Sequence, residues 1–287
     1  MALKIMLLME LSIMLTLLAP VVLVRGKLAS KHPMLLLSAW HSSLLTAALA
    51  LLLALGILIA NGALAQMGSP AAIDWLDPLA AAILAWGALA ILGVIGVRIW
   101  WQADALAKEA REAADRFSVF FGRSVRHMAM GRWYVRLVEF PVPIVAALPS
   151  PRGIIVSTEA RDRLSERELR AVLWHEDTHL THRHSAAITI GRLAQSCVPM
   201  LPAAERMAQA TSLVVELIAD DRAAAHSGAG NVASALVKLG GDSETTALRA
   251  ARLRAGASRS GEGWKLAATA IWVGPLLPLA IAFWPAA

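Results

Sequence analysis

Cysteine is almost absent from this chain of 287 residues, which contains only Cys197. A single cysteine cannot form an intrachain disulfide or a zinc site built from several thiolates. Any metal site must therefore use histidine and carboxylate ligands. Because an isolated cysteine usually behaves as a small apolar side chain, we expect Cys197 to be a buried free thiol.

Charged residues are also scarce, at 17% of the chain, while 57% of the residues are hydrophobic and the mean hydropathy is +0.57. Soluble domains are about 45–50% apolar. The first expectation is therefore a membrane protein. The net charge of +6 would suit nucleic acid or anionic lipid, but Arg and Lys beside membrane spans give the same number. We expect a lipid bilayer as a partner and no direct contact with nucleic acid.

Four apolar runs reach the length of about 20 residues that is needed to cross a bilayer. Tryptophans lie at or near their ends, where indole rings favour the headgroup level. The first run is too long for a signal peptide and has no cleavage site close behind it, so we read it as an uncleaved span. The predicted spans are Ile5 to Val24, Met34 to Ala60, Leu79 to Ile99 and Leu266 to Trp284.

The loop from Asn61 to Pro78 lacks Lys and Arg, whereas basic residues flank the spans on the other side. By the positive-inside rule, the segment between the third and fourth spans is cytoplasmic and both termini lie outside. Lys4 argues weakly for the opposite orientation. The basic residues are Arg25, Lys27, Lys31, Arg98, Lys108 and Arg111.

The chain divides into a three-helix transmembrane region at 1–101, a polar domain at 102–263 and a fourth transmembrane helix at 264–287. The middle segment is long enough for one compact domain. We predict that it begins with a helix that continues the third span as far as Gly122, and that Gly240 to Gly263 is a mobile connection. Two or three short strands are predicted from the segments Trp133 to Phe140, Pro141 to Leu148 and Gly153 to Ser157. The fold class is thus a mainly α membrane protein with an α+β domain.

Two helices of this domain are predicted from local signals. Ser165 and Glu168 form a capping box, which predicts a helix from about Glu166 to His184. A hydrophobic staple between Leu164 and Leu169 supports the same start. A second helix should cover Glu205 to His226 and end at the following Ser-Gly.

Within the first helix, residues 175–179 read HEDTH, an HExxH pattern. Four residues are just over one helical turn, so His175 and His179 project from one face and can bind a single ion. Glu176 is placed to take a proton from water that zinc activates. The alternative is a polar helix face with two ordinary histidines.

In the second helix, Glu216 and Asp220 form an ExxxD pattern on one face. By itself this pair could be a solvated helix face. Together the two motifs resemble gluzincin metallopeptidases, in which such a Glu is the third zinc ligand. The resemblance also implies that Asp220 accepts a hydrogen bond from the outer nitrogen of a ligand histidine, which we take to be His175.

Other polar residues near the motifs are weaker candidates. His182 lies seven positions after His175, or about 10 Å along one helix, so neither it nor His184 is expected to bind the same ion. Arg222 and His226 are both candidates to stabilise the oxyanion, and the spacing does not choose between them.

Two ionisable residues, Glu10 and His41, lie inside apolar runs. Such groups are costly within a membrane and usually face protein or water. A role in sensing and a role in tertiary hydrogen bonding both remain open for them.

The segments LSERELRAVLWHEDTHLTHRHS and VELIADDRAA, with a domain held between the third and fourth spans, resemble the BlaR/MecR-type membrane metallopeptidases, which are related to HtpX-like proteases. The resemblance implies one Zn²⁺ per chain, held by His175, His179 and Glu216. It implies cleavage of a cytoplasmic protein, often a transcriptional repressor, in response to an external signal. Gly153 to Ser157 would match the edge strand that pairs with an extended substrate.

One departure from the family concerns its sensor. Antibiotic-sensing members carry a penicillin-binding domain after the fourth span, whereas this chain ends three residues past Trp284, so we expect no β-lactam sensing by that route. Autolysis and turnover of membrane proteins remain open. The main rival hypothesis is a non-proteolytic signalling or scaffold protein with a structural or degenerate metal site. A transporter is disfavoured because the spans lack paired half-repeats.

Overall fold

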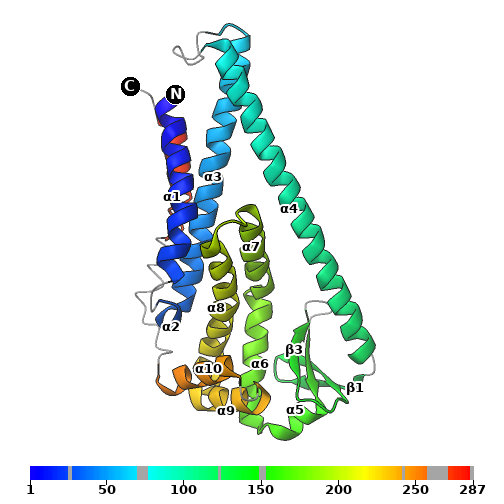
Figure 1. The fold of residues 1–287 in the computed structure, drawn as a ribbon. Coiled ribbons are helices and arrows are strands. Elements are labelled where there is room, and N and C mark those ends of the chain that lie inside the picture. Colours follow the sequence, from blue (N-terminus) through cyan, green and yellow to red (C-terminus); the bar gives the residue numbers. More distant parts are fainter. Residues whose placement is uncertain are drawn as a thin grey trace.

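The computed structural model describes residues 1–24, 28–69, 77–121, 124–148, 153–240, 243–256 and 271–284. These parts of the chain are mainly helical, with one small sheet beside a group of helices (Figure 1). The first helices are α1 (Ala2–Val24), α2 (Leu28–Lys31), α3 (Pro33–Gln66) and α4 (Pro78–Phe121). The strands are β1 (Ser124–Met130), β2 (Trp133–Val138), β3 (Val145–Leu148) and β4 (Gly153–Ser157). The later helices are α5 (Thr158–Arg163), α6 (Glu166–Thr181), α7 (His184–Cys197), α8 (Pro202–Ser227), α9 (Ala229–Gly240), α10 (Glu244–Arg254) and α12 (Leu276–Phe283).

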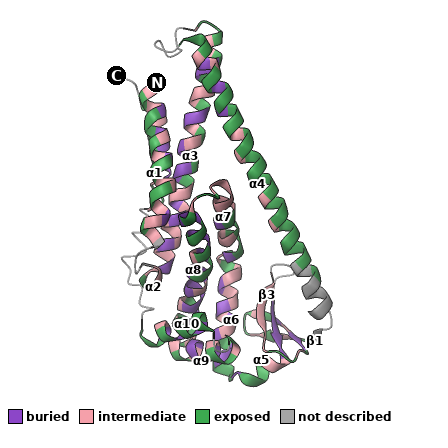
Figure 2. Ribbon diagram, in the orientation of Figure 1, coloured by how far each residue is buried: buried purple, intermediate pink, exposed green. Residues whose placement is uncertain are grey.

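Among the described residues, three helices are long and apolar enough to cross a membrane, namely α1, α3 and α4. Helix α1 packs along α3, and α4 leaves α3 near one end and runs down to the sheet (Figure 1). Gly62 permits the close approach of α3 to α4, because a Cβ there would collide with Ala85. Most described residues of α4 are exposed (Figure 2). They include large apolar residues such as Trp86, Val94 and Trp100, as expected for a surface that faces lipid.

The predicted fourth span lies only partly within the described residues, since 257–270 fall outside them. The described part contains α12, which packs against α1 and α3. Ser42 Oγ donates to the carbonyl of Ile271 at 2.6 Å. These contacts place α12 beside the other apolar helices. Residues 257–270, which the predicted fourth span would partly include, lie outside the described residues.

The sheet has the strand order β1-β2-β4-β3. Strands β2 and β4 are parallel, and the other two pairs are antiparallel. All three segments that were read as two or three strands form strands, the first two with shorter bounds and the third with the predicted bounds, while β1 was missed. The prediction that Gly153 to Ser157 is an edge strand is wrong, because β4 lies between β2 and β3 and the edge near α6 is β3. Strand order depends on pairing between distant segments, which strand length and composition do not encode.

Helix α6 begins as its capping box predicts. Ser165 N donates to Glu168 Oε2 at 2.7 Å, and Glu168 N donates to Ser165 Oγ at 3.4 Å. The predicted end at His184 is wrong, because α6 ends at Thr181 and Arg183 takes a left-handed conformation with φ of 50° before α7 starts. The break turns His184 inward, where only 2% of it is exposed.

The predicted mobile connection from Gly240 to Gly263 is wrong where it covers α10. Ser243 caps this helix by accepting from the Thr246 N–H at 3.2 Å. Leu253 is buried in the same apolar cluster as Ala171 of α6. Burial of this face fixes a segment whose Gly, Ser and Arg content suggested a linker. The predicted extension of the third span is confirmed, since α4 continues to Phe121.

Candidate metal centre

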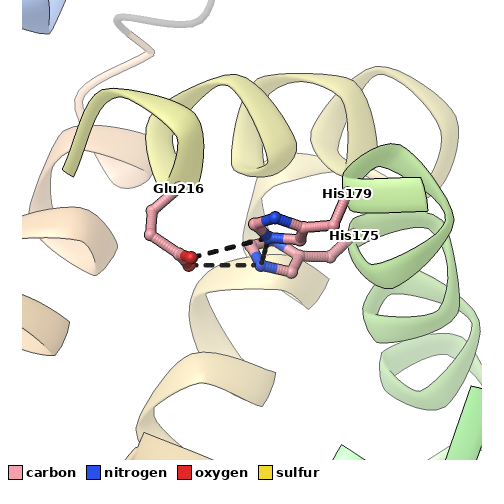
Figure 3. A group of neighbouring side chains, drawn as sticks. All are labelled: His175, His179 and Glu216. Atoms are coloured by element: carbon pink, nitrogen blue, oxygen red, sulfur yellow. Dashed lines mark hydrogen bonds and ion pairs between the residues drawn. The ribbon is translucent and has the colours of Figure 1, made fainter. Parts of the chain in front are cut away.

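Three side chains from two helices converge on one point (Figure 3). The Nε2 atoms of His175 and His179 on α6 lie 3.1 Å apart. Glu216 on α8 places Oε2 3.4 Å from His175 Nε2 and Oε1 3.5 Å from His179 Nε2. Atoms bound to a tetrahedral zinc at about 2.0–2.1 Å stand about 3.3 Å apart. The donor set and its spacing therefore fit a zinc ion.

Close packing of α6 against α8 brings these donors together. Ala171 of α6 and Ala223 of α8 are fully buried in one apolar cluster, and such small side chains allow two helices to approach closely. His175 and His179 follow each other by one turn on α6, and Glu216 faces them from α8. The site thus belongs to the rigid centre of the domain.

The outer nitrogens of both histidines have partners. His175 Nδ1 lies 3.1 Å from Asp220 Oδ1, and Asp220 is fully buried. A carboxylate can only accept, so this contact favours the His175 tautomer that leaves Nε2 free to bind a metal. His179 Nδ1 lies 3.0 Å from His184 Nδ1. Sequence reasoning missed this contact of His184, since it depends on the break after α6.

A third helix contributes Arg249, which the sequence also failed to reveal. Its guanidinium binds both oxygens of Asp220, with Nε–Oδ2 at 2.8 Å and Nη2–Oδ1 at 2.7 Å. Its Nη1 lies 2.9 Å from Glu216 Oε2. Arg249 therefore orients Glu216, a metal-ligand candidate, and Asp220, which lies beside the ligand candidate His175. The sequence does signal a helix start in Ser243, the cap of α10, and the acidic Glu244 that follows it. This signal predicts a helix but not the contact of Arg249 with Asp220.

Glu176 faces a cavity of about 320 Å³ beside the metal-ligand candidates. Its Oε2 accepts a hydrogen bond from the Ala147 N–H of β3 at 2.9 Å. Burial raises the pKa of the Glu176 carboxyl. Most of the other cavity walls are apolar, and they include Ile144, Val145, Val172, Val232, Leu236 and Leu239.

The charges at the site are strongly coupled. Burial alone would lower the pKa of His175, but Asp220 and Glu216 raise it to about 9. Burial and the positive charge of His175 lower the pKa of His179 to about 4. Burial alone would raise the pKa of Glu216, but His175 and Arg249 bring it down to about 2.

Arg222 and His226, the predicted oxyanion candidates, line a separate cavity of about 230 Å³ together with His32 and His182. The His226 ring stacks on Trp174, with 3.7 Å between ring centroids. Around Glu176, in the part of the chain that the structure describes, the cationic side chain that lines the cavity is Arg249.

Residues 145–252 match the model of Peptidase family M48, whose members are zinc metallopeptidases. The matched region runs from β3 into α10 and contains the three ligand candidates, Glu176, Asp220 and Arg249. No curated protein and no solved structure matches the chain. The family match and the geometry together support a metallopeptidase domain attached to apolar helices that suggest a membrane protein.

Proposed function

We propose that this protein is a membrane-bound zinc endopeptidase that cleaves a cytoplasmic protein, such as a transcriptional repressor. One observation carries the proposal: the Glu216 carboxylate of α8 lies within 3.5 Å of both Nε2 atoms of the HExxH motif. The match to family M48 supports the peptidase activity. The cytoplasmic substrate rests on the resemblance to BlaR/MecR-type proteins and on the positive-inside rule.

In this proposal His175, His179 and Glu216 hold one Zn²⁺, which supplies Lewis acidity toward the peptide carbonyl. Glu176 takes the proton of the attacking water and later gives it to the leaving amine. Burial raises its pKa and so brings the base nearer to the working pH. The Ala147 N–H holds one carboxylate oxygen and thereby orients Glu176.

The substrate chain would lie along β3. Ile144 O accepts from Ser157 N at 2.9 Å, so the alternating Val145 and Ala147 direct their backbone groups away from β4. Because the Ala147 N–H is already bound to Glu176, an extended peptide would pair with this edge as an added strand through the Val145 N–H and the carbonyl groups of Val145 and Ala147. The apolar cavity beside it suits an apolar side chain next to the scissile bond.

Replacement of the general base tests the proposal. The Glu176→Ala variant, purified as the full chain in detergent, should keep its fold and its zinc, while casein cleavage falls by about 10²–10⁴-fold, as for loss of a general base. Asp177→Asn is the matched control, since Asp177 is adjacent but points to Arg132 at 3.8 Å. Undiminished cleavage by Glu176→Ala would show that the activity has another source.

The rival hypothesis of a signalling or scaffold protein with a degenerate metal site has one observation in its favour. Arg249 lies 2.9 Å from Glu216 Oε2 and competes with a metal ion for that oxygen. In that case the purified protein would contain little zinc, and Glu176→Ala would change no measured activity.

A further inference from the structure

A third and larger cavity, of about 810 Å³, lies away from the metal centre between α1, α3, α4 and α7. Three of these helices are the candidate membrane spans. Its volume falls within the range of about 300–1,000 Å³ that is usual for small-molecule sites. Because membrane helices form most of its walls, its natural contents are lipid rather than water.

The cavity has a polar end and an apolar end. Along α3 its lining runs from Leu37 to Leu51, and along α7 it runs from Arg183, just before the helix, to Val198, just after it. Each stretch spans about 20 Å at 1.5 Å per residue. His41 and His182 lie at the same end as Arg183, near the junction of α6 and α7. The far end is lined mainly by apolar side chains, among them Leu45, Ile95, Ile99, Ile190 and Leu193.

Arg183 gives the polar end its charge. Arg183 is the one residue with a permanent charge among the described residues that line the cavity. No Asp or Glu is among these lining residues. Burial lowers the pKa of the neighbouring His182, so this imidazole is neutral near pH 7. A ligand with an anionic group therefore complements the cavity, and a cationic one does not. Arginine is well suited to phosphate because its fork of N–H groups can bind two oxygens.

We propose that this cavity binds one anionic phospholipid, with its phosphate held by Arg183 and an acyl chain lying between α3, α4 and α7. The length and apolar lining of the cavity fit an acyl chain of the lipid, and the positive charge of Arg183 favours a lipid with an anionic headgroup. The bound lipid would also hold the junction at Arg183 that turns His184 toward His179. The lipid site does not depend on whether the protein is a peptidase.

Native mass spectrometry of the full chain in detergent can test the proposal, with dioleoyl phosphatidylglycerol and dioleoyl phosphatidylcholine as probes. We expect one phosphatidylglycerol to bind on the order of tenfold more tightly than phosphatidylcholine, because both lipids offer a phosphate to Arg183 but phosphatidylcholine also brings a cationic choline group close to it. Arg183→Asn should abolish this preference, since asparagine tolerates φ of 50° but has no charge. Arg183→Lys should retain most of it. The matched control is Arg192→Asn on the adjoining helix α7, whose arginine pairs with Glu109 at 3.2 Å.

Two further arms separate a lipid from other occupants. Ala194→Phe fills the apolar end and should weaken phosphatidylglycerol binding without touching Arg183, which keeps the test decisive even if Arg183→Asn fails to fold. Millimolar glycerol phosphate should not displace the lipid; displacement would assign the site to a free phosphate. Equal binding of both lipids, or unchanged binding in Arg183→Asn and Ala194→Phe, would overturn the proposal.

Discussion

At the scale of single residues, Arg249 links the carboxylate of Glu216, a metal-ligand candidate, to that of Asp220, which lies beside His175. Asp220 is fully buried, and Arg249 is the cation that binds it. Removing one member of a buried ion pair leaves the other charge uncompensated, which costs about 3–5 kcal/mol. We therefore expect Arg249→Gln to lower the free energy of unfolding by about that amount.

Thermal or urea unfolding of the purified chain measures this loss. Arg163→Gln is the control, because its pair with Glu159 is exposed at 50% and 36% and should contribute less than about 1 kcal/mol. Equal losses in the two variants would mean that Arg249 does not stabilise the buried carboxylate.

The residues of the site differ in how far the sequence could predict them. His175, Glu176 and His179 follow from helical spacing within one short motif. Glu216 followed from a second motif combined with a known layout. Arg249 and His184 could not be predicted, because each reaches the site through a distant packing event, in one case the docking of α10 and in the other the break after α6.

At the scale of elements, Glu168 connects the start of α6 to α9. Its carboxylate accepts a hydrogen bond from the backbone N–H of Ser165 in the capping box. It also accepts from Ser234 Oγ at 2.5 Å and from Lys238 Nζ at 2.7 Å. Burial alone would raise the pKa of Glu168, but these hydrogen bonds bring it down to about 2. Because the folded pKa lies below the unfolded value of about 4.3, the stabilisation is complete above that value and is lost as the pH falls toward 2.

The Glu168→Gln variant should therefore be less stable than the wild type at pH 7, by about 1–3 kcal/mol as for a charged hydrogen-bonded group. The difference should shrink as the pH falls from 5 toward 2. Melting temperatures measured across this range would show it, and a difference independent of pH would refute the ionic origin.

Helix starts and spans were predictable because their signals are local. The capping box fixes where α6 begins, and apolar length identifies α1, α3 and α4. The end of α6, the existence of β1 and the order of the strands were not predictable, because contacts between distant segments decide them. Helix α10 was missed because its composition suggests a linker, whereas its burial depends on packing against α9 and α8.

At the scale of the whole molecule, the side of the membrane that holds the domain determines which substrates can reach it. The positive-inside rule predicts a cytoplasmic domain. Met67, at the far end of α3, is 79% exposed. In a Cys197→Ser background, a cysteine introduced by Met67→Cys should react with an impermeant thiol reagent in intact cells. Arg161→Cys in the domain should react only after lysis. The opposite labelling pattern would invert the orientation and exclude a cytoplasmic substrate.

The zinc content of the purified protein tests the central claim, a metal centre built from α6 and α8. Elemental analysis of the wild type should give about one zinc per chain. Glu216→Ala should lose most of it, because the third donor is gone, whereas His182→Ala should retain it, because His182 caps α6 outside the group of three donors. A wild-type protein without zinc, or a Glu216→Ala protein that keeps its zinc while His182→Ala loses it, would contradict the account.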